Sequence, residues 1–434
     1  MTKIQFLLGR IGVMLTVAAT VGIAQSTSAI AASFSKYAGI DLGSLDKGST
    51  TITATSLNDL GQVVGRYNVV NAAGVSSNAS YIWQNGTMTA LPLTGLKIGG
   101  PNDGQPVTMP GRGSLARSLN NNGIIIGTGD ELPGATDRAM TWTPNGSGGY
   151  SLTVEEFGGV ESYFTDINNV DQIAGYHIFA PGKQNAIYRE NGSNTNTILP
   201  GIGGDRNQAL ALNDNGQVVG SVDGDGVQND TTVNSAALWQ KDASGNYVLT
   251  NLGRNGSQQS VAREINDIGQ VVGQLTNGSG ATATSSAFLW QNNAFTDLGG
   301  LGGTVRNAVG INNQGQVVGF SSNSSNQELA FIWNDGMMAD LNSLLVDSLL
   351  VGGANVSLTR ATGINNRGDI AAYGTYTYVD AQGVTRTGTR AYLLKSVPES
   401  DTALSLLAFG AIGGVSFWRR NRRKATAAVE SSPA

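Results

Sequence analysis

The sequence contains no cysteine and one histidine, His177, among its 434 residues. Without cysteine there are no disulfides and no Cys-ligated metal or redox centres. A single histidine excludes a metal site built from several imidazoles. Only 13% of the residues are charged and the net charge is −5, so the chain lacks the basic excess that nucleic-acid binding requires. We therefore expect no nucleic-acid partner.

Sequence motifs typical of catalytic sites are also absent. No Gly-x-Ser-x-Gly element presents a nucleophile, and no glycine-rich loop has the pattern of a phosphate-binding site. His177 follows Tyr176 near the end of an expected strand, where a hydrogen-bonded surface histidine is the usual case. The sequence predicts that the protein is not an enzyme.

Glycine, in contrast, is abundant, with 60 residues. Together with scattered Asn, Ser and Thr and little long helical periodicity, this composition predicts an all-β fold of short strands and tight turns. The chain is long enough to bury a large core.

One ten-residue unit recurs seven times. Its clearest copy is Gly-Ile-Asn-Asn-Gln-Gly-Gln-Val-Val-Gly, residues 310–319. The first Asn of the copies is at position 58, 120, 168, 213, 266, 312 and 365, a mean spacing of about 51 residues. Periods of this length are typical of propellers and other repeat arrays.

Each repeat predicts four short strands. The first ends just before the Asn and carries a small residue, Ala in six copies, that suits a crowded strand near a shared axis. Asn-Asn/Asp-x-Gly is a turn, because Asn and Asp tolerate turn conformations and Gly allows positive φ. Gln-Val-Val-Gly is the second strand, and its Gly indicates close backbone packing.

The third strand ends in an aromatic residue, and five of the six Trp residues occupy this position. We interpret these Trp side chains as packed between adjacent sheets, because their neighbours are apolar; a sugar-stacking platform is the alternative. The fourth strand resembles Phe295–Leu301 in most repeats, but the seventh repeat has none.

A matching strand, Ile40–Leu45, lies alone before the first repeat. An N-terminal strand that completes the last sheet would close a ring, which an open solenoid does not need. Residues 32–396 are therefore predicted to form a seven-bladed β-propeller of four-stranded blades closed by an N-terminal strand.

The order Gly-Ile-Asn-x-x-Gly-x-Val-Val-Gly, Ala-Phe-Leu-Trp and Asp-Leu-Gly-x-Leu-Gly-Gly resembles the HAF-type extracellular repeat of bacterial secreted proteins. The likeness covers nearly all of residues 37–395. The His of the family's His-Ala-Phe element is absent from all seven copies, so no role of that His is carried over. The resemblance implies a surface or secreted repeat protein with no assigned reaction.

Residues 1–31 have the pattern of a secretory signal peptide. Lys3 and Arg10 are followed by an apolar run, Ile11–Ala24, that is too short to span a bilayer, and Ala29-Ile30-Ala31 offers a cleavage site. A buried N-terminal helix is the alternative.

The C-terminal segment, residues 397–424, has three parts in order. Val397-Pro398-Glu399 comes first, then the apolar run Thr402–Trp418, then a basic cluster, residues 419–424. The run is at the lower limit for a single transmembrane helix, and the basic cluster favours a cytoplasmic tail. The remaining residues, 425–434, are expected to be disordered.

This arrangement resembles the bacterial PEP-CTERM sorting signal, with Ser400 where the second Pro of that motif stands. The resemblance implies processing by an exosortase-type membrane protease and delivery to the cell envelope, cell surface or extracellular matrix. A plain C-terminal anchor is the alternative, and it too leaves residues 32–396 outside the cytoplasmic membrane.

Arginine recurs beside the first strand of the repeats. In a propeller these side chains could converge on one mouth of the central channel and offer planar donors to the carboxylates or sulfates of an acidic polysaccharide. Pairing with each other and with blade-edge carbonyls is the structural alternative. The five residues are Arg117, Arg206, Arg263, Arg306 and Arg360.

Asp223 and Asp225 alternate with glycine in the loop of the fourth repeat. Such spacing can present carboxylates to Ca²⁺, but the closing Glu of an EF-hand loop is missing. A polar turn is the alternative, and no other cofactor is expected.

Two functions follow from these patterns. The first is a non-catalytic binding or structural module at the cell surface or in the matrix, with polysaccharide or surface proteins as partners. The second is a carbohydrate-active enzyme, a glycosidase or lyase, whose paired carboxylates lie in the axial funnel. Three acidic residues, Asp166, Asp205 and Glu264, flank the predicted innermost strand. They do not occupy the same position in successive repeats, which argues against this function.

Overall fold

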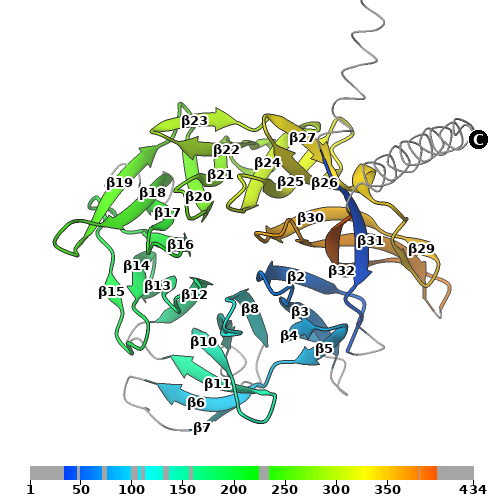
Figure 1. Ribbon diagram of the computed structural model, residues 1–434, viewed down its shortest axis with the longest axis horizontal. Coiled ribbons are helices and arrows are strands. Elements are labelled where there is room, and N and C mark those ends of the chain that lie inside the picture. The colour runs from blue at the N-terminus through cyan, green and yellow to red at the C-terminus, as the bar shows by residue number, and fades with distance from the viewer. Residues whose placement is uncertain are drawn as a thin grey trace, which may run out of the picture.

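The computed structural model describes residues 34–45, 49–70, 76–98, 106–108, 113–130, 136–155, 160–223, 234–380 and 382–397. These residues form seven β-sheet blades around a central axis (Figure 1). The all-β, seven-bladed propeller predicted from the repeats is confirmed. The segment 1–31, the tail 425–434 and all of 397–424 except Val397 lie outside the described residues.

Blades 1 to 3 are built from the first three repeats. Blade 1 contains β2 (Ile52–Leu57), β3 (Val63–Val70), β4 (Ser76–Gln84) and β5 (Thr87–Ala90). Blade 2 contains β8 (Ser114–Leu119), β9 (Ile125–Asp130), β10 (Asp137–Pro144) and β11 (Tyr150–Glu155). Blade 3 contains β12 (Glu161–Ile167), β13 (Ile173–Ala180), β14 (Lys183–Arg189) and β15 (Thr197–Ile198).

Blades 4 to 6 repeat the same order. Blade 4 contains β16 (Gln208–Leu212), β17 (Val218–Asp223), β18 (Asn234–Lys241) and β19 (Tyr247–Gly253). Blade 5 contains β20 (Gln259–Ile265), β21 (Val271–Asn277), β22 (Thr284–Gln291) and β23 (Ala294–Asp297). Blade 6 contains β24 (Gly302–Ile311), β25 (Val317–Asn323), β26 (Glu328–Asn334) and β27 (Met337–Asp340).

Blade 7 contains β30 (Ser357–Ile364), β31 (Ile370–Val379), β32 (Thr385–Val397) and, as its outermost strand, β1 (Lys36–Asp41). The first strands of neighbouring blades contact one another around the ring, so the strand before each Asn is the innermost one. Two short 3₁₀ helices, η2 (Gly280–Thr282) and η3 (Leu341–Leu344), and a small hairpin, β28 (Leu350–Val351) with β29 (Ala354–Asn355), occupy connections. No helix in the described part of the chain could cross a bilayer, and the expected transmembrane segment lies outside that part.

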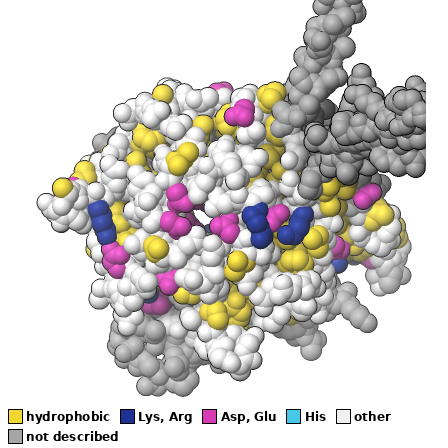
Figure 2. Space-filling view, viewed as in Figure 1, with side chains coloured by type: hydrophobic (Ala, Val, Ile, Leu, Met, Phe, Trp, Pro, Cys, Tyr) yellow, Lys and Arg dark blue, Asp and Glu magenta, His cyan; other side chains and the backbone are white. Residues whose placement is uncertain are grey.

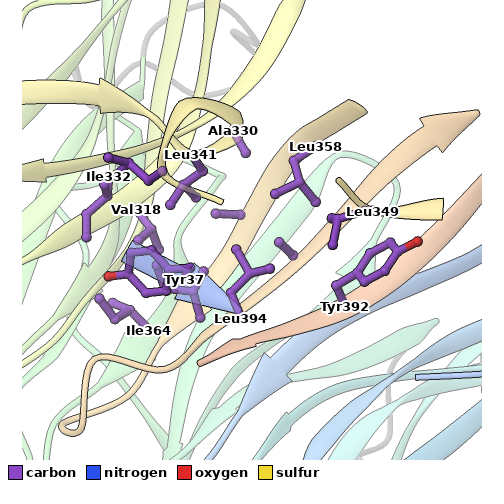
Figure 3. Packing of buried hydrophobic residues seen from close by; sticks show 14 of the residues in the cluster. Tyr37, Val318, Ala330, Ile332, Leu341, Leu349, Leu358, Ile364, Tyr392 and Leu394 are labelled. Atoms are coloured by element: carbon purple, nitrogen blue, oxygen red, sulfur yellow. The ribbon is translucent and has the colours of Figure 1, made fainter. Parts of the chain in front are cut away.

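An N-terminal strand closes the ring as predicted, but it runs over Lys36–Asp41 and not over the expected Ile40–Leu45. β1 pairs antiparallel with β32, from Lys36 opposite Val397 to Asp41 opposite Tyr392. Tyr37 is 1% exposed and packs among side chains of blades 6 and 7, including Val318 and Leu394 (Figure 3). The first and last described strands of the chain therefore share one hydrophobic core.

Blade 2 departs from the predicted four strands. β6 (Thr94–Ile98) pairs in parallel with β11, and β7 (Pro106–Thr108) pairs with β6, so this sheet has six strands. Both extra strands come from the connection between blades 1 and 2. The other six blades have the predicted four strands.

The repeated turns have the expected backbone. The glycine that ends the turn has positive φ in six copies, for example 76° at Gly315, and Asp171 takes its place in the third copy with φ 62°. The second strand has glycine at this place in six copies and Ala372 in the seventh. At Gly220 glycine is required, because a Cβ there would overlap the carbonyl oxygen of Gln208.

The Asn of each turn also joins the blades, a role that the repeat pattern does not predict. Its Oδ1 accepts backbone hydrogen bonds within its own turn, and its Nδ2 donates to the carbonyl oxygen of the equivalent Asn in the next blade. These inter-blade bonds run Asn58, Asn120, Asn168, Asn213, Asn266, Asn312, Asn365 and back to Asn58, at 2.9–3.0 Å. We call this closed circle the Asn ring.

A second circle lies beside the first. The backbone N–H of the residue after each Asn donates to the side-chain oxygen of its counterpart in the next blade. The members are Asp59, Asn121, Asn169, Asp214, Asp267, Asn313 and Asn366. The Asn-Asn/Asp pair is therefore both a turn former and the link between blades.

The Trp residues pack as interpreted. All five at the third-strand position are at most 9% exposed, and the indole Nε1 of Trp142 and Trp239 donates to the carbonyl oxygen of Pro92 and Pro200. The stacking-platform alternative is wrong for these side chains.

Candidate functional site

Each innermost strand carries a β-bulge directly after the Ala, or in the third repeat Phe164, that recurs at one position of the repeat. In β2, for example, pairing with β3 skips from Ala54 to Ser56 and leaves Thr55 unpaired. A bulge turns the extra side chain out of the ladder, and here all seven extra side chains line one axial cavity. They are Thr55, Arg117, Thr165, Leu210, Arg263, Val309 and Thr362.

Two cavities lie on the axis. The first, of about 300 Å³, is lined by the bulges and by the Asn-containing turns, and we call it the turn-side cavity. The second, of about 380 Å³, opens toward the starts of the innermost strands, and we call it the loop-side mouth. Thr55, Arg117, Thr165, Val309 and Thr362 line both, so the two spaces adjoin as one channel. Figure 2 shows an opening at the centre of one face, with acidic side chains around it.

The loop-side mouth combines cationic and aromatic side chains. Arg66, Arg117 and Arg360 line it with Phe320 and Tyr373. Arg360 donates to Glu328 at 2.6 Å, and its guanidinium lies 4.0 Å from the centroid of the Phe320 ring. Burial raises the pKa of the Tyr373 hydroxyl, and the nearby positive charges of Arg360 and Arg66 oppose that rise.

Arg66 and Arg117 differ from Arg360 in having no acidic partner. No carboxylate of the described residues lies within ion-pair distance of either guanidinium. The Nε of Arg117 is also buried without a hydrogen-bond partner. Since a buried donor usually has an acceptor, this side of the mouth is suited to an anionic or oxygen-rich ligand.

The five arginines singled out from sequence do not all converge. Arg117 and Arg263 line the turn-side cavity, and Arg117 and Arg360 line the loop-side mouth. Arg206 and Arg306 line neither. The Arg306 guanidinium lies 3.7 Å from the Asp297 carboxylate and donates to the carbonyl oxygen of Gly299. This agrees with the alternative in which these arginines pair with other groups of the protein.

Two acidic residues, Asp166 and Glu264, also line the turn-side cavity. Each follows directly on a bulge, where the other blades have Ser, Ala or Gly. Asp166 accepts hydrogen bonds from the Ser118 hydroxyl at 2.6 Å and the Leu212 backbone N–H at 3.0 Å.

Burial raises the pKa of Asp166 to about 6. Burial and the charge of Asp166 both raise the pKa of Glu264 well above its usual value. Both side chains are half-buried in the channel wall. The sequence indicated that these acids flank the inner strand, but only the bulges bring them to the same cavity.

The candidate calcium site is divided between described and undescribed residues. Asp223 ends β17, is 3% exposed, and accepts a hydrogen bond from the Asp205 backbone N–H; Asp225 lies outside the described residues. Within the described ranges no group of three His, Cys, Asp or Glu side chains is arranged to hold a metal. His177 lies on β13, and burial lowers its pKa.

Val397, the first residue of the sorting motif, is the last residue of β32. It pairs with Lys36 of the N-terminal strand. The ladder of blade 7 therefore reaches one residue beyond the predicted boundary at residue 396. Pro398 and Glu399 lie outside the described residues.

Comparison with known proteins gives one family. Residues 205–396 match a family described as a protein of unknown function, DUF3466. This segment corresponds to blades 4 to 7 without β1. No curated protein matches the sequence.

The solved structures that resemble this chain have low sequence identity to it. A prolyl endopeptidase has 10% identity and a TM-score of 0.43, with 81% of this chain and 51% of that chain covered. An acylaminoacyl peptidase of Pyrococcus horikoshii has 9% identity and a TM-score of 0.35, with 77% and 59% covered. A chain described as a glycoside hydrolase has 10% identity and a TM-score of 0.24, with 86% and 96% covered. This chain spans little more than half the length of the two peptidases.

Proposed function

We propose that the protein is an exported, non-catalytic module of the cell surface or extracellular matrix that binds an acidic polysaccharide at the loop-side mouth. The observation that carries this proposal is the pair Arg66 and Arg117, which line the mouth without an acidic partner among the described residues. Guanidinium groups bind carboxylates and sulfates through paired hydrogen bonds.

A neighbouring aromatic group supports the same ligand class. Tyr373 lines the mouth beside the arginines and is half-buried, whereas Phe320 is 8% exposed and lies against the Arg360 guanidinium. A sugar ring presents C–H groups to an aromatic face, while its acidic substituent requires a cation; the two kinds of side chain in one mouth match both needs.

Export is proposed from the two ends of the sequence. The signal-like segment 1–31 and the likeness of residues 397–424 to a PEP-CTERM signal support secretion and handling by an exosortase-type protease. Before processing, the apolar run Thr402–Trp418 would hold the chain in the membrane as a transmembrane helix.

A carbohydrate-active enzyme is the second candidate, and the observation in its favour is the pair Asp166 and Glu264 in one cavity. Glycoside hydrolysis uses two carboxyl groups on either side of the scissile bond. However, Asp166 already accepts hydrogen bonds from Ser118 and Leu212. Because its oxygens are engaged in joining blades, we favour binding over catalysis.

The test follows retention and cleavage in one assay. The purified full chain is passed over immobilised acidic extracellular polysaccharide from the producing organism, with neutral dextran as the control polymer, and released reducing ends are measured. We expect retention on the acidic polymer alone and no new ends. Release of ends would replace this proposal with the enzymatic one.

Variants locate the site. Arg66→Gln and Arg117→Gln each remove an unpaired guanidinium and should weaken retention about tenfold, the order expected for a lost charge-assisted contact. Arg254→Gln is the matched control, because Arg254 donates a hydrogen bond to the Gln258 carbonyl oxygen in the connection before β20 and lines neither axial cavity. Equal retention of all three variants would refute the mouth as the site.

A further inference from the structure

Blade 7 has charged side chains where most other blades have neutral ones. In five blades the residue after the turn is a Gln that accepts a hydrogen bond from the Asn of the turn, as Gln62 does from Asn58. Blade 7 has Asp369 at this place, and its carboxylate pairs with Arg367 at 2.9 Å and with Lys395 at 3.4 Å. Because five blades fold with Gln at this position, folding does not require the three charges.

The two cations of this group face solvent, whereas the acid is enclosed. The side chains of Arg367 and Lys395 are 49% and 44% exposed, and that of Asp369 is 8% exposed. Both cationic ends lie near Gly61, since a Cβ there would be 2.9 Å from Nη2 of Arg367 and 3.8 Å from Nζ of Lys395. Leu60, the residue before Gly61, is 63% exposed. We call Leu60, Arg367 and Lys395 the basic corner.

The basic corner lies where the described chain ends. Leu394 pairs with Ile370, the first residue of β31 after the turn, and the last three residues of β32 extend past it beside β1. β32 therefore ends at the turn side of blade 7, and Figure 1 shows β31 and β32 at the rim of the ring. Only four residues, 398–401, separate Val397 from the apolar run Thr402–Trp418.

This short connection limits the distance between the basic corner and a bilayer that the apolar run spans. The five Cα–Cα steps from Val397 to Thr402 cover at most about 17 Å. The lipid headgroups occupy about 5–8 Å of this length. Val397 then lies within about 10 Å of the membrane surface, close to the Debye length at physiological ionic strength. Charges on the basic corner are therefore near enough to interact with lipid headgroups.

Charges across the ring on the turn side have the opposite sign. Asp214 and Asp267, in the turns of blades 4 and 5, line the turn-side cavity, as does Asp59 of blade 1. Lys36 and Asp347, on the side of the chain end toward blade 6, offset each other. An anionic surface attracts exposed Lys and Arg and repels carboxylates. It would therefore draw the basic corner closer and keep blades 4 and 5 away.

We propose that the basic corner binds anionic lipid headgroups at the outer surface of the bilayer, so that blade 7 stands against the membrane and the loop-side mouth opens away from it. The proposal rests on the proposed anchoring of the chain by Thr402–Trp418, and it adds the lipid partner and the orientation of the propeller. It does not depend on which ligand the mouth binds.

The test measures how close two labelled sites come to the membrane in the full chain. The sequence has no cysteine, so Leu60→Cys and Ile268→Cys each provide a single site for a bimane label. The two residues hold the same turn position in blades 1 and 5 and are 63% and 62% exposed, which makes Ile268 the matched control. The chain is inserted in nanodiscs of phosphatidylcholine, with or without one third phosphatidylglycerol, that contain a headgroup spin label as quencher.

We expect stronger quenching at position 60 than at position 268. Adding phosphatidylglycerol should shift the equilibrium toward contact about fivefold, the effect of about one net positive charge near an anionic surface. High salt should remove this shift. Pairing of the basic corner with Glu399 and Asp401 of the connection is the competing account, and it predicts no dependence on lipid charge.

A triple variant tests the charges directly. Arg367→Gln, Asp369→Gln, Lys395→Gln gives blade 7 the Gln that other blades have at the corresponding places, so it should fold, which thermal unfolding checks. Its label at position 60 should be quenched equally in neutral and anionic discs.

Equal quenching at positions 60 and 268, or quenching at position 60 that neither lipid charge nor the triple variant changes, overturns the proposal and leaves the anchoring and the polysaccharide site standing. A full chain that does not float with the discs refutes the anchoring and the proposal together. Selective quenching at position 60 that depends on phosphatidylglycerol, in a chain that acidic polysaccharide does not retain, supports the lipid contact and refutes the polysaccharide function alone.

Discussion

The Asn ring predicts that replacing one amide nitrogen by oxygen in a single turn lowers the unfolding free energy of the propeller. In the turn of blade 4, Asn213 is 4% exposed. Its Nδ2 donates to the Asn266 carbonyl oxygen at 2.9 Å and to the Gln217 side chain at 2.8 Å. Its Oδ1 accepts from the backbone N–H groups of Asn215 and Gln217. Asn213→Asp keeps the acceptor and removes both donated bonds.

The loss of unfolding free energy follows from the burial of the groups around Asn213. The Asn266 carbonyl loses its inter-blade partner in a buried position, which costs about 1–3 kcal/mol. The new carboxylate also faces two acceptor oxygens, so we expect a total of about 2–4 kcal/mol. With an unfolding entropy of about 2.1 cal/mol/K per residue over about 360 residues, this corresponds to a Tm lower by about 3–5 °C.

The assay is thermal unfolding followed by circular dichroism at pH 7.5 and pH 5. The defect of Asn213→Asp should shrink at the lower pH, because a protonated Asp can again donate to the Asn266 carbonyl. Asn215→Asp is the matched control in the same turn: Asn215 is exposed and donates a single bond to Asp267. A control variant as unstable as Asn213→Asp would refute the structural role of the ring.

Three further predictions concern closure, packing and titration. Tyr37→Ala empties the core that joins β1 to blades 6 and 7 and should lower the unfolding free energy by about 3–5 kcal/mol, measured by urea unfolding; an unchanged midpoint would show that β1 is not needed for closure. Gly220→Ala places a Cβ on the Gln208 carbonyl oxygen and should cost at least about 1–3 kcal/mol, whereas Gly146→Ala, with open space around it, should be close to neutral in the same urea titration. Asp166 has a folded-state pKa of about 6 against an ordinary 3.8, so its ionisation opposes folding and stability should fall by up to about 3 kcal/mol as the pH rises from about 4 through 6; Asp166→Asn should remove that fall, and a variant with the wild-type pH profile would contradict the assignment.

Much of the fold could be predicted because the repeat carries it. The seven turns, the Gly of the second strand and the Trp of the third strand each have a local physical cause that repeats at a regular spacing. Closure was predicted from one extra strand before the first repeat and one strand missing from the seventh, and β1 pairs with β32 to complete that blade. The added strands β6 and β7 could not be predicted, because they lie in a connection that no other repeat matches.

The site was less predictable for geometric reasons. The sequence shows which charged residues lie beside the innermost strand. Which of these side chains face the axis depends on the bulge, because the extra residue shifts by one position the alternation of side chains between the two faces of the strand. That shift sends Arg117 and Arg263 to the axis and leaves Arg206 and Arg306 outside. Arg66 was missed because it follows the second-strand Gly, where the other repeats have Thr, Tyr, Ser, Gln and Phe. The bonds of the Asn ring join residues about 50 positions apart, and nothing local in one turn reveals them.

The central claim is that an acidic sugar binds on the propeller axis. A crystal structure of the chain with a bound galacturonate oligosaccharide at pH 5.5 tests it most directly. The account predicts a sugar carboxylate within hydrogen-bond distance of the guanidinium groups of Arg66 or Arg117, with a sugar ring against Tyr373. An oligosaccharide bound on the outer strands of a blade, with the channel free of it, would contradict the account.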